Sequence, residues 1–185
     1  RAGFLVSSGE LVANIDADTR MIPGWLDKVF EEFSRNNKLV ALSGPFIYYD
    51  LSKNVRLAVR MFYYAGFFSY LINRYILGVG SMLQGGNFVV KRTALEAIGG
   101  FNSDFDFWGE DTDLARRLVK VGGVKFTFDL PIYASGRRLE RDGVARTGWR
   151  YTLNYFSTIF FNKPYDTVKK DFKDKYAKTL AKIKE

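Results

Sequence analysis

The hydrophobic and polar positions along the chain predict strands that alternate with helices. Short apolar runs rich in β-branched residues are typical of strands in a sheet. Segments with apolar side chains at helical intervals separate them. Runs of the strand type occupy residues 11–15, 38–50, 87–92 and 124–129, and the second run is interrupted by Gly44-Pro45. The alternation predicts an α/β fold, with a mixed sheet flanked by helices.

The helical segments have clearer boundaries than the strands. Residues 1–10 begin on what looks like the end of a helix. In the segment 21–37, Pro23 suits a first helical turn, and one face would hold Trp25, Leu26, Val29, Phe30 and Phe33. Further helices are predicted at 55–77, 93–100 and 110–121, and two more after residue 143. Residues 135–143 are interpreted as a basic loop.

The acidic pair Asp16 and Asp18 directly follows the first predicted strand, which we expect to be buried. Ligands of open α/β sheets bind at the carboxyl ends of the strands. Acids in a loop are more often turn formers or helix caps. The second possibility is a site for a hard divalent cation that also binds a diphosphate.

Composition narrows the chemistry of such a site. The 185 residues include no cysteine and no histidine, so a metal would need oxygen ligands, as Mg²⁺, Mn²⁺ or Ca²⁺ accept. A histidine general base is excluded for the same reason. The net charge of +8 favours an anionic partner, such as a nucleotide phosphate, an anionic lipid or a nucleic acid.

A second acidic centre begins the helix predicted from residue 110. Glu110, Asp111 and Asp113 could simply stabilise the positive end of the helix dipole. The glycines in "QGGNF" and "GGF" could likewise be an ordinary loop and a helix stop. Their joint order is more specific, because an acid pair follows a strand, Gly-Gly-Asn precedes a strand, and Trp-Gly-Glu-Asp begins an amphipathic helix.

That order resembles the family 2 inverting glycosyltransferases, whose nucleotide-sugar-binding fold is called GT-A. The matching segments are "GELVANIDADT", "PGWL", "QGGNFVVKRTALEAIGGFN" and "WGEDTDLARRLVKVGG". The resemblance implies transfer of a sugar from a nucleotide-diphosphate donor, a UDP-sugar by default, to a hydroxyl of a glycan or lipid-linked acceptor. It also implies Mn²⁺ or Mg²⁺ as the cofactor.

The resemblance also implies roles for particular residues. Asp16 and Asp18 correspond to the metal and diphosphate motif, and Asp111 to the general base. Trp108 and Glu110 correspond to the acceptor pocket, and Gly85, Gly86 and Asn87 to the loop that lines the donor sugar. Arg137 and Arg138 are candidates for phosphate contacts, since guanidinium groups bind phosphate well.

Two features depart from the family pattern. Members commonly add a late histidine to the metal site, so a third metal ligand is left open here. The nucleotide-base-binding block that normally comes first is not found, so we expect a GT-A domain truncated at its N-terminus, over residues 1–146. A basic helical extension would then follow at 147–185.

The sequence also allows three other hypotheses about function. A non-catalytic fragment or remnant could act as a structural or partner-binding domain. A nucleic-acid module ranks lower, because basic residues are not interleaved with aromatic ones along one strand. The lysine-rich segment 169–185 is either a solvated helix face or, with the aromatic segments 56–74 and 149–161, a contact with an anionic membrane. We expect a cytoplasmic protein, with peripheral membrane contact as the alternative.

Overall fold

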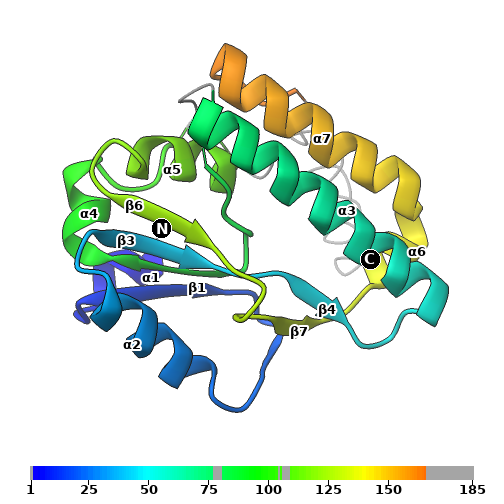
Figure 1. Cartoon of the computed structure of the whole chain (residues 1–185), viewed down its shortest axis with the longest axis horizontal. Coiled ribbons are helices and arrows are strands. Elements are labelled where there is room, and N and C mark those ends of the chain that lie inside the picture. Colours follow the sequence, from blue (N-terminus) through cyan, green and yellow to red (C-terminus); the bar gives the residue numbers. More distant parts are fainter. Residues whose placement is uncertain (1, 77–80, 104, 106–108, 166–185) are drawn as a thin grey trace, which may run out of the picture.

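A computed structural model gives the fold and describes residues 2–76, 81–103, 105 and 109–165. Helices and strands alternate through these residues (Figure 1). The helices are α1 (Ala2–Val6), α2 (Trp25–Arg35), α3 (Lys53–Leu71), the π-helix η1 (Ile72–Ile76), α4 (Arg92–Ala97), α5 (Glu110–Leu118), α6 (Arg137–Asp142) and α7 (Val144–Phe161). The strands are β1 (Leu11–Ile15), β2 (Arg20–Met21), β3 (Leu39–Ser43), β4 (Phe46–Tyr48), β5 (Asn87–Lys91), β6 (Gly123–Phe126) and β7 (Ile132–Ala134).

The described strands form two sheets. The larger has the order β1-β5-β3-β6, with β5 antiparallel to both β1 and β3 and with β3 parallel to β6. The smaller has the order β2-β7-β4, with β7 antiparallel to β2 and parallel to β4. Mixed pairing confirms the predicted mixed α/β fold, and this architecture is consistent with a GT-A-like fold.

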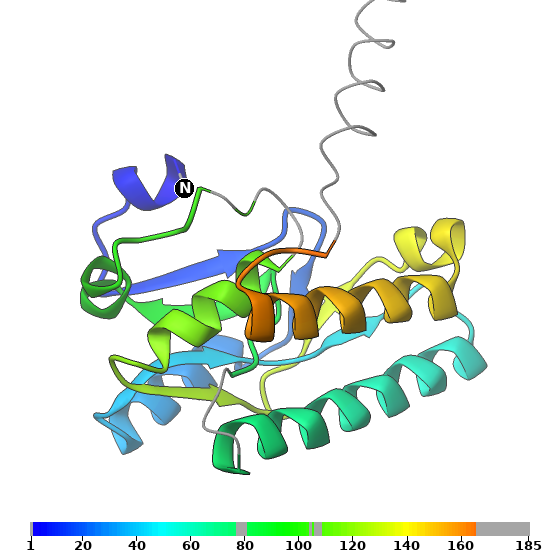
Figure 2. The same ribbon diagram turned by 90° about the horizontal axis from the view of Figure 1, so that it is seen from above.

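Helices cover both faces of the larger sheet (Figure 1). On one face, α2 inserts Trp25, Val29 and Phe33 into a cluster with strand residues that include Leu42 and Val89. On the other face, α4 and α5 pack on the sheet, and α3 and α7 extend beyond them over the smaller sheet (Figure 2). The buried clusters on the two faces hold the sheet between layers of helices.

The first acidic pair follows an edge strand. We expected β1 to be buried, but Ala13 and Asn14 are exposed, and β1 pairs only with β5 among the described strands. The predicted face of α2 was too wide, because Leu26 and Phe30 are more than half exposed while Trp25 is buried. Leu11, Val12 and Ile15 are the residues of β1 that pack against the core, and α2 packs through a narrower stripe than the sequence predicts.

The strand predicted at 38–50, with an interruption at Gly44-Pro45, is divided at those residues into β3 and β4, which lie in different sheets. Gly44 lies between them, and a Cβ there would overlap the carbonyl of Leu130, so the crossing requires glycine. The segment 135–143 is not a loop, because α6 occupies Arg137–Asp142 between two glycines. The strands β2 and β7 were also missed. A helix of six residues and strands of two or three are too short to show a period.

The predicted start of the helix after Pro23 was also early. Gly24 adopts a left-handed conformation with φ of 78°, and α2 begins after it at Trp25. The proposed division between residues 146 and 147 stays a prediction; it falls within the continuous helix α7. The segment 169–185 lies outside the described residues.

Candidate active site

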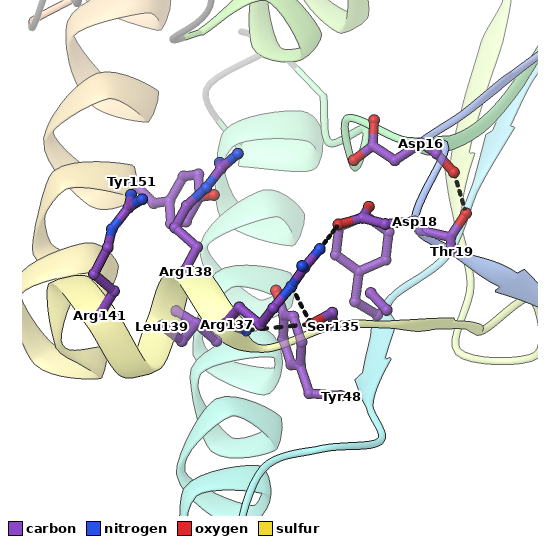
Figure 3. A pocket seen from close by; sticks show the side chains of 12 residues that line it. Asp16, Asp18, Thr19, Tyr48, Ser135, Arg137, Arg138, Leu139, Arg141 and Tyr151 are labelled. Carbon is purple, nitrogen blue, oxygen red and sulfur yellow. Dashed lines mark hydrogen bonds and ion pairs between the residues drawn. The ribbon is translucent and has the colours of Figure 1, made fainter. Parts of the chain in front are cut away.

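A cavity of about 390 Å³ lies where the two sheets meet. One side is formed by Asp16, Asp18 and Thr19 after β1, and the other by α6 (Figure 3). The remaining lining residues are Phe46, Tyr48, Ala134, Ser135, Arg137, Arg138, Leu139, Arg141 and Tyr151. The cavity therefore has carboxylates facing guanidinium groups, a charge arrangement suited to a ligand that bears both phosphates and a cation.

Backbone and hydroxyl contacts fix the loop that carries the acids. The Asp16 N–H donates to the carbonyl of Gly86 at 3.3 Å, and the Asp16 carbonyl accepts from the Thr19 hydroxyl at 2.7 Å. Burial raises the pKa of the Asp16 carboxyl and the nearby Asp18 raises it further, whereas Arg138 lowers it. The two carboxylates therefore repel each other, and a bound cation would relieve this repulsion.

The arginines come from α6, which the fold holds by its N-terminus. Asp50 accepts hydrogen bonds from the Ser135 hydroxyl and the Gly136 N–H, both at 2.6 Å, and these bonds lower the pKa of Asp50, the Ser135 bond most. From the start of this helix, Arg137 reaches Asp18 at 3.3 Å. The side chain of Arg138 lies beside that of Tyr151 (Figure 3). The predicted Arg137 and Arg138 thus both line the cavity.

The glycine loop brings the two acidic centres together. Gly85 donates its N–H to a carboxylate oxygen of Asp111 at 3.0 Å, and Gly86 lies directly against the carboxylate of Asp16. A Cβ at Gly86 would overlap that carboxylate, and the φ of 83° there favours glycine. Two acids that are far apart in sequence therefore meet at neighbouring residues, whose Cα atoms lie about 3.8 Å apart.

Asp111 is held at the start of α5 in a partly buried position. Its second carboxylate oxygen accepts from the Thr112 N–H at 2.8 Å. Burial raises the pKa of Asp111, while the hydrogen bonds from Gly85 and Thr112 lower it, and the net direction is upward. A carboxyl with a raised pKa is a better proton acceptor than an ordinary aspartate, as general-base catalysis requires.

Asp113, two residues further on, has a different role. It is 1% exposed and forms ion pairs with Arg117 at 2.7 Å and Arg116 at 3.1 Å. Arg117 also donates to the carbonyls of Ile98 and Gly100. Asp113 therefore anchors the Gly99–Gly100 turn to α5 and does not face the cavity.

Asn87 is buried among protein partners. Its side chain accepts from the Trp25 indole at 3.2 Å and donates to the carbonyls of Gly44 and Leu130, both at 2.9 Å. Asn87 does not line the cavity, and neither do Gly85, Gly86 and Asp111. The structure thus gives Asn87 a role in joining β5 to the crossing between the two sheets, and Gly85 and Gly86 are the residues of this loop that contact the acids.

Two tyrosines that the sequence did not single out complete the site. Burial raises the pKa of Tyr151, to which Asp111 and Asp16 add, while Arg138 lowers it by its charge and a hydrogen bond. Burial also raises the pKa of Tyr48. Both tyrosines line the cavity with Asp16 and Asp18. Their positions depend on the packing of α7 and β4, so no spacing in the sequence could have shown them. Glu110 lies one residue before Asp111 at the start of α5, and Trp108 lies outside the described residues.

The family follows from comparison with known proteins. A family model described as glycosyl transferase family group 2 matches residues 11–165 of the chain. The chain belongs to this family. No curated protein matches the chain.

As a family 2 glycosyltransferase, the chain is an enzyme of a family that uses nucleotide-sugar donors and glycan acceptors. The match covers every described residue of the cavity and α5. Among the described residues, no cluster of three or more acidic side chains could hold a metal unaided. Two carboxylates still fit Mg²⁺ or Mn²⁺ when a diphosphate supplies further oxygen ligands, as is usual for Mg²⁺.

Proposed function

We propose that this glycosyltransferase uses a metal-bound nucleoside diphosphate sugar, UDP-sugar by default, and transfers the sugar with inversion to a hydroxyl acceptor. The observation that carries the proposal is the meeting of Asp16 and Asp111 at the adjacent residues Gly85 and Gly86. A direct displacement needs the group that receives the acceptor proton and the groups that hold the leaving diphosphate in one site.

In this proposal, Asp16 and Asp18 hold Mg²⁺ or Mn²⁺ together with the donor diphosphate. The metal would neutralise charge on the leaving diphosphate. Arg137 and Arg138 face the acids across the cavity and bind phosphate oxygens. The ion pair of Arg137 with Asp18 would exchange for phosphate contacts, because an exposed pair costs little to separate.

Asp111 removes the proton of the acceptor hydroxyl as that oxygen attacks the anomeric carbon. The carbon–oxygen bond to the diphosphate breaks in the same step, and the proton stays on the Asp111 carboxyl. The N–H of Gly85 fixes the orientation of this carboxyl. The acceptor is a glycan or a lipid-linked sugar, and Glu110 and Trp108 stay proposed as acceptor contacts.

The first experiment is a calorimetric titration of the 185-residue chain with UDP, with and without Mn²⁺. We expect binding that requires the metal, a weaker signal with GDP, and loss of binding in Asp18→Asn. Asp111→Asn is the matched control, because it should retain UDP binding and lose transfer. UDP binding that needs no metal and survives Asp18→Asn would contradict the proposed site. If UDP binds neither with nor without Mn²⁺, the result would favour the non-catalytic alternative.

A further inference from the structure

Helix α3 carries a line of apolar side chains on its solvent side. Leu57, Met61, Tyr64 and Phe68 follow one another at intervals of four, three and four residues, which places them along one face of a helix. All four are exposed, and Phe68 is 65% exposed. The opposite side of α3 is buried through Val59, Tyr63 and Tyr70. This helix is therefore apolar on two sides, of which the core covers one.

Helix α7 repeats the same spacing. Trp149, Leu153, Phe156 and Phe160 also lie at intervals of four, three and four residues. Trp149 is 64% and Phe160 is 54% exposed. The rings of Phe156 and Phe160 stack at 6.2 Å with an angle of 8° between their planes. Helix α7 thus carries a second apolar line, which is exposed at Trp149, Phe156 and Phe160 and half-buried at Leu153.

The two helices run alongside each other over the same part of the fold (Figures 1 and 2). Gly148 of α7 lies close to the ring of Phe62 on α3. Asn73, in the π-helix that continues α3, donates to the hydroxyl of Tyr155 at 3.1 Å. We call α3 and α7, with their exposed side chains, the α3–α7 surface.

The charges of the α3–α7 surface have one sign. The sequences of the two helices contain no acidic residue, and they contain the cations Lys53, Arg56, Arg60, Arg146 and Arg150. Arg60 lies over the ring of Tyr64, with its guanidinium 5.8 Å from the ring centre. Helix α2 offers a contrast, because beside its exposed Phe30 it carries Asp27, Glu31 and Glu32. Like charges would oppose pairing of this surface with a second copy of itself.

We propose that the α3–α7 surface docks on an anionic lipid bilayer. Helices that lie in the membrane interface combine tryptophan, phenylalanine and leucine with arginine and lysine, as these two helices do. The contact that we propose is a peripheral one, made by exposed side chains of the two helices. Among the helices of the described residues, none has the length and apolarity to cross a bilayer. The docking does not depend on the proposed donor chemistry.

The test measures sedimentation of the 185-residue chain with lipid vesicles. We expect binding to vesicles that contain phosphatidylglycerol, much weaker binding to pure phosphatidylcholine, and loss of binding as salt is raised. Phe68→Ser and Phe160→Ser should each lower the partition coefficient about tenfold, since each removes a phenyl ring from the contact. Arg56→Gln should lower it about fivefold, through the charge alone.

Helix α2 supplies matched controls on the other face of the sheet. Phe30 is 59% exposed, close to the value for Phe68, so Phe30→Ser should leave the partition coefficient unchanged. Arg35→Gln is the corresponding control for charge. Far-ultraviolet circular dichroism and thermal melting report whether each variant is folded, and Phe68→Ser and Phe160→Ser test the two helices independently.

Three results would overturn the proposal. The first is equal binding to anionic and neutral vesicles, or to neither. The second is an equal loss in Phe30→Ser and in the two surface variants, which would make the binding non-specific. The third is a change of oligomeric state in Phe68→Ser or Phe160→Ser with vesicle binding intact, which would assign this surface to a protein partner.

Discussion

Asp111 and Asp113 lie two residues apart on α5, and the same substitution should have opposite consequences at the two positions. Asp113→Asn removes the counter-charge of Arg117 and Arg116 inside the protein. Breaking a buried ion pair from one side costs about 3–5 kcal/mol. Because the two arginine side chains keep 20% and 23% of their surface exposed, screening favours the low end, about 3 kcal/mol. For a chain of this length, the melting temperature should fall by roughly 6–12 °C.

Asp111→Asn is the matched control. In the parent chain, the raised pKa of Asp111 means that the folded state binds the proton more tightly than the unfolded chain does. Ionisation of Asp111 therefore lowers the stability of the fold as pH rises through the raised pKa. Neutralising the side chain removes that cost, and the loss of one hydrogen bond from Gly85 or Thr112 offsets it. We expect a change in the free energy of unfolding within about 1 kcal/mol.

Urea denaturation followed by circular dichroism measures both variants, and a transfer assay below the melting temperature completes the comparison. Asp113→Asn should unfold more easily and keep its activity, while Asp111→Asn should stay stable and lose activity. Equal losses of stability, or a loss below about 1 kcal/mol in Asp113→Asn, would refute the assignment of a structural role to Asp113.

The glycine loop and the acids allow three further predictions. Gly86→Ala should weaken Mn²⁺-dependent UDP binding at least tenfold in calorimetry, because the added Cβ displaces the Asp16 carboxylate. Gly99 has a similar positive φ but open space where a Cβ would lie, so Gly99→Ala should bind UDP as the parent chain does. The value of kcat/KM should fall on acidification, because the Asp111 carboxyl must be ionised to act as a base. Its pKa is raised, so the midpoint of the fall should lie above about pH 4, the ordinary pKa of aspartate. A midpoint at or below that pH would count against this role. Asn87→Ala should destabilise the fold by about 2–4 kcal/mol in urea denaturation, since it leaves the Trp25 indole and two buried carbonyls without their partner. An unchanged stability with weaker UDP binding would instead support the predicted role of Asn87 as a donor contact.

The sequence was most informative where one segment contains both a clear hydrophobic periodicity and the functional residue. Asp16 follows a short apolar strand and Asp111 begins an amphipathic helix, and the structure has both at those places. Asp113 was harder to distinguish from Asp111, because both follow Gly109 in the first turn of α5. The burial of Asp113 and its ion pairs with Arg116 and Arg117 show that it points into the protein.

Contacts between distant segments account for the rest. Tyr151 reaches the cavity because α7 packs beside α6, and α6 is itself too short to show a helical period. The exposed lines on α3 and α7 have the spacing of a buried stripe, so the sequence pattern alone cannot tell which of the two apolar sides of α3 faces the core. That distinction required the packing of the whole fold.

The adjacent positions of Gly85 and Gly86 have a consequence for how the two substrates affect each other. Gly86 lies against the carboxylate of Asp16, and the Gly85 N–H donates to Asp111. A ligand that shifts the first carboxylate therefore shifts the hydrogen bond that orients the second. By thermodynamic linkage, the donor should then alter the affinity for the acceptor, and the acceptor should alter the affinity for the donor by the same factor.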